Sequence, residues 1–267
     1  MLSVFKNTWL RARKTMLFWC IALVLWALTE LSLFKSIMSE GGMAQMFEGA
    51  MQNMPEVLKQ MFFTMDITTP VGYFNARLLS LTLPLVMVIH GISLGNAAVA
   101  GEEQHGQLDL LLSNPISRTR YYLGRWLAMV TMQLLLVGVF YLTCVGMAPM
   151  MGIPFEGAHL LDALVSVFLL GLTASSLALM AGSLFPHAGV VMGVSSVVLL
   201  LSYLLNAAAP LNADLKDLQK LSVFYYYNEY LPIKNGLEAS KALVLLGAAL
   251  VLGVVGLIRF NTRDLSK

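Results

Sequence analysis

The chain has 267 residues, of which 58% are hydrophobic and only 12% are charged. A soluble domain usually carries about 25% charged residues, so this chain has about half the usual means of facing water. The net charge of +2 is too small to argue for a nucleic-acid-binding protein, and the two cysteines, Cys20 and Cys144, lie inside apolar runs and do not predict a disulfide framework.

The apolar residues gather in six runs, and a helix needs about 20 residues to cross a bilayer. Spans are predicted at about 16–34, 78–100, 126–150, 163–185, 188–209 and 242–258, the last being short. Backbone groups in lipid must be paired within the chain, which favours helices. The predicted fold class is therefore an all-α polytopic membrane protein, with six transmembrane helices in a single transmembrane domain over 1–267.

The first fifteen residues place Leu2, Phe5 and Trp9 on one helical face and keep Lys6 and Arg13 off it. This pattern predicts an N-terminal interfacial amphipathic helix over 1–15. A basic flank that only orients the first span is the alternative.

The distribution of basic residues predicts the orientation. With both termini in the cytoplasm, the inner segments hold ten of the 17 Lys and Arg residues but only four of the 15 acids. Cytoplasmic loops are enriched in Lys and Arg, so we expect a multi-pass protein of the cell (inner or plasma) membrane with both termini cytoplasmic.

Two outer segments are long. The segment 38–72 carries several methionines on one predicted helical face. Thioethers bind Cu(I), so copper handling is possible, but a pliable amphipathic helix packed on the ends of the spans is favoured. The outer loop 210–241 holds an aromatic cluster suited to the headgroup level, and the sequence leaves open whether this loop re-enters the membrane.

Two spans carry glycines four residues apart, Gly91 with Gly95 and Gly189 with Gly193. Small residues at this spacing let helices approach closely in lipid. Packing within the chain is favoured over a dimer seam. The connection between the fourth and fifth spans is very short, which predicts that these two spans are antiparallel neighbours.

The densest charge pattern lies between the second and third spans, in the cytoplasmic loop 101–122, with the sequence GEEQHGQLDLLLSNPISRTRYY. A short helix there places Leu108, Leu111 and Leu112 on one side. Asn114-Pro115 ends it, because the residue before proline avoids the α region. Ser117 is then a predicted N-cap of the third span. An exposed apolar patch with a polar rim is typical of a partner site, and a leucine side lying in the membrane interface is the alternative.

This loop resembles the inner loop of the permease subunits of ABC-2 type (type V) ABC exporters. That loop reads E-x-x-x-G-T-L-x-x-L-L-x-x-P-(I/V)-S-R, and Gln107 departs from it where threonine is frequent. The resemblance also covers the layout of six spans. It implies that 102–118 is a coupling helix seated on an ATP-binding subunit. The matching residues are Glu102, Glu103, Gly106, Leu108, Leu111, Leu112, Pro115 and Arg118.

The resemblance further implies two permease copies, as a homodimer or heterodimer, and two ATP-binding subunits. The substrate path lies between the permeases and is lined by the second and fifth spans. His90, Asn96 and Asn206 are candidates for that path. No cofactor is expected in this chain, because ATP and Mg²⁺ belong to the partner subunit.

The chain contains no Gly-Lys dipeptide and therefore no P-loop, so we expect no ATPase activity in this chain itself. His90 is the one ionisable group predicted well inside a span; it either serves function or bonds to a neighbouring helix. Two other functions remain open at this point. One is a membrane scaffold or sensor without transport, and the other is an ion- or copper-handling permease.

Overall fold

The structure, a computed structural model, describes residues 1–39, 49, 55, 69–104, 106, 116–153, 157–211 and 215–263. Within these residues the regular structure is helical and includes no strand, and six helices are long and apolar enough to cross a membrane. The predicted fold class is confirmed. The amphipathic helix predicted in the segment 38–72 and the alternative of copper binding both depend on methionines that lie outside the described residues, namely Met43, Met46, Met51 and Met54.

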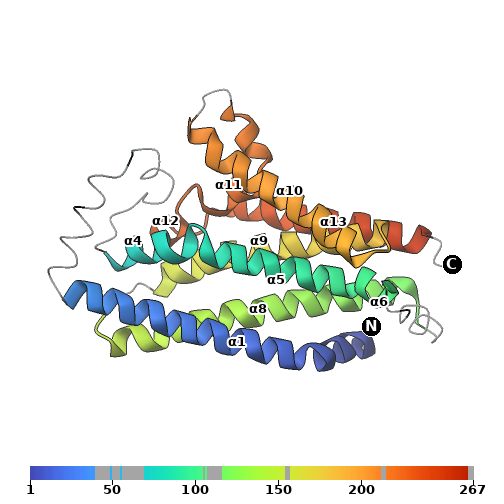
Figure 1. Ribbon diagram of the computed structural model, residues 1–267, viewed down its shortest axis with the longest axis horizontal. Coiled ribbons are helices and arrows are strands. Elements are labelled where there is room, and N and C mark those ends of the chain that lie inside the picture. Colours follow the sequence, from blue (N-terminus) through green and yellow to red (C-terminus); the bar gives the residue numbers. More distant parts are fainter. Residues whose placement is uncertain are drawn as a thin grey trace.

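The long helices run side by side (Figure 1). They are α1 (Leu2–Ser39), α5 (Thr82–Ala98), α8 (Arg118–Met150), α9 (Gly157–Leu184), α10 (Ala188–Ala208) and α13 (Ala239–Thr262). Short elements are α4 (Pro70–Phe74), η1 (Asn75–Leu79), α6 (Ala100–Gln104), η2 (Ala209–Leu211), η4 (Leu218–Leu221), α11 (Val223–Asn228) and α12 (Pro232–Asn235). The N-terminus, α6 and the end of α13 lie at one end of the bundle.

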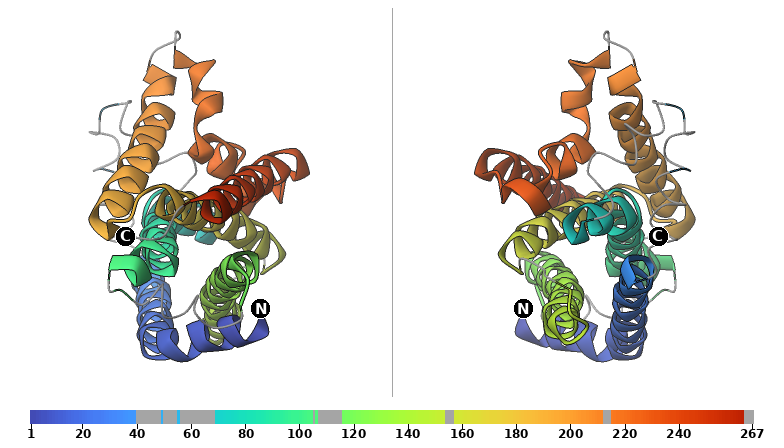
Figure 2. Two further views of the ribbon diagram at one scale, coloured as in Figure 1. Left: turned by 90° about the vertical axis from the view of Figure 1, so that its right-hand side faces the viewer. Right: turned by 90° about the vertical axis from the view of Figure 1, so that its left-hand side faces the viewer.

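The predicted interfacial segment and first span form one continuous helix, α1. Its first part crosses the end of the bundle before the helix turns along its neighbours, as Figure 2 shows. Val4 and Met16 are buried, whereas Leu2 and Leu10 are exposed. The amphipathic N-terminal segment therefore covers part of the bundle with one face only.

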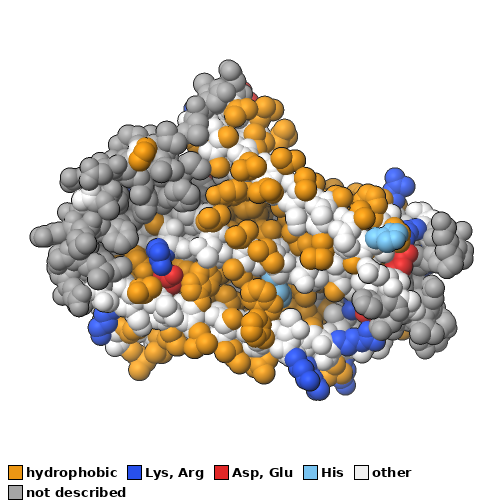
Figure 3. Space-filling model, viewed as in Figure 1, with side chains coloured by type: hydrophobic (Ala, Val, Ile, Leu, Met, Phe, Trp, Pro, Cys, Tyr) orange, Lys and Arg blue, Asp and Glu red, His pale blue; other side chains and the backbone are white. Residues whose placement is uncertain are grey.

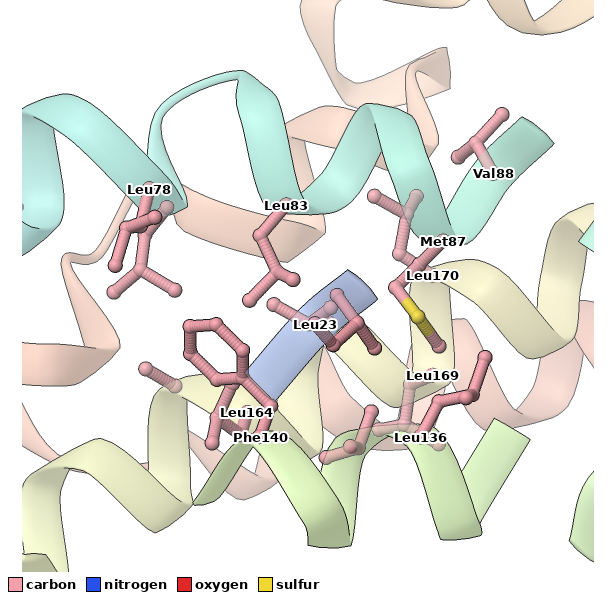
Figure 4. Close-up of a cluster of buried hydrophobic side chains, with 14 of the residues drawn as sticks. Leu23, Leu78, Leu83, Met87, Val88, Leu136, Phe140, Leu164, Leu169 and Leu170 are labelled. Atoms are coloured by element: carbon pink, nitrogen blue, oxygen red, sulfur yellow. The ribbon is translucent and has the colours of Figure 1, made fainter. Parts of the chain in front are cut away.

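Helix α9 is the centre of the bundle. It packs against α5, α8, α10 and α13, while α1 packs chiefly on α8. Figure 2 shows this arrangement of the helices from the two ends of the bundle. The core between these helices consists of aliphatic and aromatic side chains, among them Leu23, Met87, Leu136, Phe140 and Leu170 (Figure 4).

Local sequence explains several helix boundaries. Ser117 caps α8 as predicted, since its hydroxyl accepts a hydrogen bond from the Arg120 amide at 3.3 Å. The connection between α9 and α10 is three residues long, 185–187, so these helices are antiparallel neighbours, as predicted. Thr69 caps α4 in the same way as Ser117 caps α8, with Pro70 in its first turn.

On the face shown in Figure 3, apolar side chains cover much of the middle of the molecule, and charged side chains lie mainly toward its two ends. Helices α1, α10 and α13 expose many large apolar side chains, such as Leu17, Leu201 and Val251. Such a surface is not stable in water over this area, but it matches hydrocarbon. The distribution agrees with helices that cross a bilayer.

Candidate functional site

The candidate site is the joint from which the loop between α6 and α8 emerges. Helix α6 follows α5 after a kink at Val99, where φ is −127° and ψ is −67°. Gly106 has a φ of +66°, a conformation that favours glycine. Of the residues matched to the coupling loop, Glu102, Glu103, Gly106 and Arg118 are described; the others, Leu108, Leu111, Leu112 and Pro115, lie outside the described residues.

Glu102 and Arg125 form a buried ion pair in this joint. Their side chains are only 9% and 7% exposed. The Arg125 Nε donates to the Tyr121 hydroxyl at 3.1 Å, and that hydroxyl donates to the Ala98 carbonyl at 2.9 Å. The chain of bonds fixes the end of α5, α6 and the start of α8 relative to one another.

Arg11 of α1 also binds Glu102. Its Nη1 lies 3.1 Å and 3.2 Å from the two carboxylate oxygens, and the Arg11 side chain is 47% exposed. Glu102 is therefore held by one buried and one half-exposed guanidinium. A buried carboxylate without a partner would be strongly destabilising, so these two guanidinium groups stabilise Glu102 in its place.

Glu103, next along α6, binds a different part of the chain. Its Oε1 accepts from Arg263 Nη2 at 2.6 Å. On the far side of the loop, Arg118 donates to carbonyl oxygens at the end of α13. The structure thus brings Glu102, Glu103 and Arg118 into one charged joint that contacts α1, α8 and α13.

Gln104, the last residue of α6, reaches α10. Its Oε1 accepts a hydrogen bond from the Ala188 amide at 3.1 Å, at the first residue of α10. An orphan amide at a helix start is commonly satisfied by such a side chain. The start of the loop therefore also contacts the fifth span.

Sequence reasoning missed three members of the joint, namely Arg11, Tyr121 and Arg263. Arg11 is 91 positions from Glu102, and Arg263 is 160 positions from Glu103. No local spacing relates residues that far apart. The sequence held one signal for them: each is a basic or aromatic residue that lies near the end of a predicted helix, on the side of the membrane where the loop was also predicted.

The structure does not gather the three predicted path residues. His90 is buried in α5, with its ring edge-on to Trp19 at 5.5 Å between centroids. Asn96 lies near the loop end of α5. Asn206 accepts from Gln219 at 3.1 Å, and it is about 27 Å along α10 from Ala188 at 1.5 Å per residue. Their part in a path stays a prediction.

A groove of about 390 Å³ lies between α5 and α10. Leu85, Ile89 and Ile92 line one side, and Leu199, Leu200 and Tyr203 line the other. Its volume lies within the usual range for small-molecule sites, and its walls are nearly all hydrocarbon. An apolar molecule suits this groove better than a charged one.

The two glycine pairs have different environments. A Cβ on Gly95 would lie 2.4 Å from the Ser175 carbonyl oxygen, and one on Gly91 would lie 2.6 Å from that of Gly171. These glycines allow α5 to pack closely on α9, as predicted for packing within the chain. A Cβ on Gly189 or Gly193 would meet no other residue of the described part of the chain within 4 Å.

Gly91 and Gly95 also flank Ser93 in the order Gly-x-Ser-x-Gly, the sequence of a hydrolase nucleophile elbow. That elbow requires a strand-to-helix turn that exposes the serine above a sheet. Ser93 instead lies inside α5. The match therefore carries no catalytic assignment.

A second polar cluster lies at the opposite end of the bundle. The buried Glu30 carboxylate accepts from the Tyr73 hydroxyl at 3.0 Å, from two nitrogens of Arg77 at 3.3 Å and from Trp26 Nε1 at 3.3 Å. This clamp joins α1 to α4 and to η1, a π-helical segment. Because η1 leads into α5, the clamp fixes the far end of the second span.

The segment 215–238 is anchored to the same region. The Tyr227 hydroxyl donates to the Leu79 carbonyl at 2.7 Å, and burial raises the pKa of that hydroxyl well above its usual range. The phenol therefore remains a hydrogen-bond donor. It joins α11 to the end of η1.

The fold defines a class: a helical, polytopic membrane protein with a charged joint where one loop leaves the bundle. Comparison with known families identifies the family within this class. Residues 2–265 match the model of the ABC-2 family transporter protein. The chain therefore belongs to the ABC-2 transporter family, as its loop sequence indicated. No curated protein matches the chain significantly.

Proposed function

We propose that the chain is the permease subunit of an ATP-driven ABC exporter, coupled to a separate ATP-binding subunit through residues 102–118. Family membership supports a membrane component that works with such a subunit. The observation that carries the proposal is the charged joint. Glu102 and Glu103 at one root of the loop, and Arg118 at the other, contact three of the long helices.

The proposed mechanism follows from this joint. ATP binding in the partner changes the surface that holds the loop. Because the roots of the loop are tied to α1, α8 and α13, a displaced loop moves these helices together. The membrane subunits then pass between inward-facing and outward-facing states. Nucleotide shifts that equilibrium only as far as the loop contacts differ between the two states. ATP and Mg²⁺ act in the partner subunit.

The proposed assembly contains two permease copies and two ATP-binding subunits. The exposed side of α10 supports a contact with a second copy. It carries Gly189 and Gly193, at which an added Cβ would meet no other described residue within 4 Å, beside exposed Val190 and Val197. Replacing Gly193 with leucine is expected to shift the detergent-solubilised complex to a single permease copy in native mass spectrometry. Unchanged stoichiometry would argue against this face.

The substrate path is proposed to run beside α5 and α10, the second and fifth spans. The apolar groove between these helices supports this position. His90, Asn96 and Asn206 are retained as candidate polar residues of the path. Export from the cytoplasm follows from the family resemblance.

The docking claim is tested with Leu111→Asp. A charge on the leucine side of the loop is expected to abolish co-purification of the ATP-binding subunit, while the permease still folds and inserts. Leu221→Asp is the matched control, because Leu221 is 77% exposed and lies in η4, outside the spans. If the Leu111 variant retains the ATP-binding subunit at wild-type stoichiometry, the docking proposal is wrong.

A further inference from the structure

The residue that follows α13, Arg263, is bound from both ends of the loop. Its guanidinium donates to Glu103, which precedes the loop, at 2.6 Å. Its carbonyl oxygen accepts from Arg118, which follows the loop, also at 2.6 Å. Side chain and backbone of one residue thus connect the two roots of the loop to each other and to the last span.

Further bonds extend this contact. Arg263 Nη1 donates to the Gly182 carbonyl at 3.3 Å, at the end of α9. Arg118 also donates to the Phe260 and Asn261 carbonyls at 3.4 Å, in the last turn of α13. Cations at helix C-termini are stabilised by the carbonyls that lack helical partners. Two helix ends are therefore held by two guanidinium groups.

The pair of Arg263 and Glu103 is well shielded. Their side chains are 18% and 22% exposed, in contrast to the 47% of Arg11. An ion pair largely removed from water is screened less than a surface pair, so it holds its geometry better. The contact is suited to transmitting a displacement.

We propose that Arg263 is a positioning residue that passes movement of the loop to α13 and α9. The proposal rests on the proposed coupling to an ATP-binding subunit and names a further residue of the same joint. Helix α9 packs against α5, α8, α10 and α13. Movement that reaches its end through Arg263 therefore reaches the centre of the bundle.

The test uses the full chain, assembled with the ATP-binding subunit that co-purifies with it, in lipid nanodiscs. Spin labels are placed at Leu142→Cys on α8 and Val251→Cys on α13, both exposed, in a background with Cys20→Ala and Cys144→Ala. The distance between the labels is measured without nucleotide and after vanadate trapping with Mg-ATP.

The variant Arg263→Gln is expected to keep the ATP-binding subunit and to reduce the nucleotide-driven change in label distance about threefold, within the range for residues that modulate coupling between sites. Arg259→Gln is the matched control, since Arg259 is exposed in the last turn of α13 and its replacement removes the same charge. It is expected to behave as the wild type.

A double variant with Glu103→Arg and Arg263→Glu exchanges the two charges and restores the ion pair with the acid and the base in each other's place. It therefore tests whether the contact between positions 103 and 263 is what transmits the movement. Recovery of the distance change in this chain supports the proposal, including where the single variant assembles poorly. An unchanged response in Arg263→Gln overturns it and leaves the proposed function intact. A wild-type chain that recruits no ATP-binding subunit overturns both.

Discussion

The guanidinium of Arg125 on α8 is paired with the carboxylate of Glu102 on α6, and both side chains are almost fully buried. Charged groups withdrawn from water are costly unless each satisfies the other. This pair lies where the loop leaves the bundle. A displacement of the loop root that separates the two groups would therefore lose the stabilisation that the pair provides.

Replacing Glu102 with glutamine is expected to lower the free energy of unfolding by about 3–5 kcal/mol, because Arg125 is left buried without an anion. Arg11→Gln is the control. Since the Arg11 side chain is 47% exposed, its loss is expected to cost about 1 kcal/mol or less. Unfolding by denaturant in micelles measures the free energy of unfolding of both variants. Equal small losses would contradict the burial of the pair between Glu102 and Arg125.

The close approach of α5 to α9 gives a second prediction. Gly95→Ala places a methyl group within 3 Å of α9 atoms and is expected to destabilise the protein by about 1–3 kcal/mol. Gly193→Ala meets nothing within 4 Å and is expected to leave the melting temperature of the single permease unchanged or slightly raised. Reversal of this order in thermal unfolding would show that the helices pack differently.

At the opposite end of the bundle, Tyr73→Phe removes the hydroxyl that donates to Glu30. A hydrogen bond to a charged group contributes about 1.5–3 kcal/mol, and a loss of this size is expected in the free energy of unfolding. Tyr225→Phe is the control, because its ring lies over Lys241 and is retained in phenylalanine. The double variant with Glu30→Gln is expected to lose less than the sum of the single losses.

The orientation of the chain is tested by labelling in intact cells. A cysteine at Gln104, in a background without Cys20 and Cys144, is expected to resist a membrane-impermeant maleimide until the cells are opened. A cysteine at the exposed Leu221 is expected to react at once. Prompt labelling at position 104 in intact cells would place the loop outside and end the proposed coupling.

The sequence was informative wherever the determinant was local. Runs of about 20 apolar residues predicted the six helices, because the hydrocarbon thickness sets that length. Ser117 was predicted as a cap from its place between Asn114-Pro115 and the third span, and its partner amide in the structure, that of Arg120, is only three residues away. The loop sequence indicated the family, and the match over residues 2–265 confirmed it.

The charged joint was only half predictable. Glu102 and Glu103 were recognised from the loop, but their partners Arg11 and Arg263 come from opposite ends of the chain. Which basic residue meets which acid depends on how α1 and α13 pack, and helix packing in lipid is decided by shape along whole helices rather than by spacing in one segment.

The central claim, that an ATP-binding subunit holds the loop 102–118, is tested most directly by a photo-crosslinking amino acid at Leu111. The account predicts an ultraviolet-dependent crosslink between the permease and the ATP-binding subunit, whose yield changes when Mg-ATP and vanadate are added. A crosslink to lipid alone, with the ATP-binding subunit present in the complex, would contradict it.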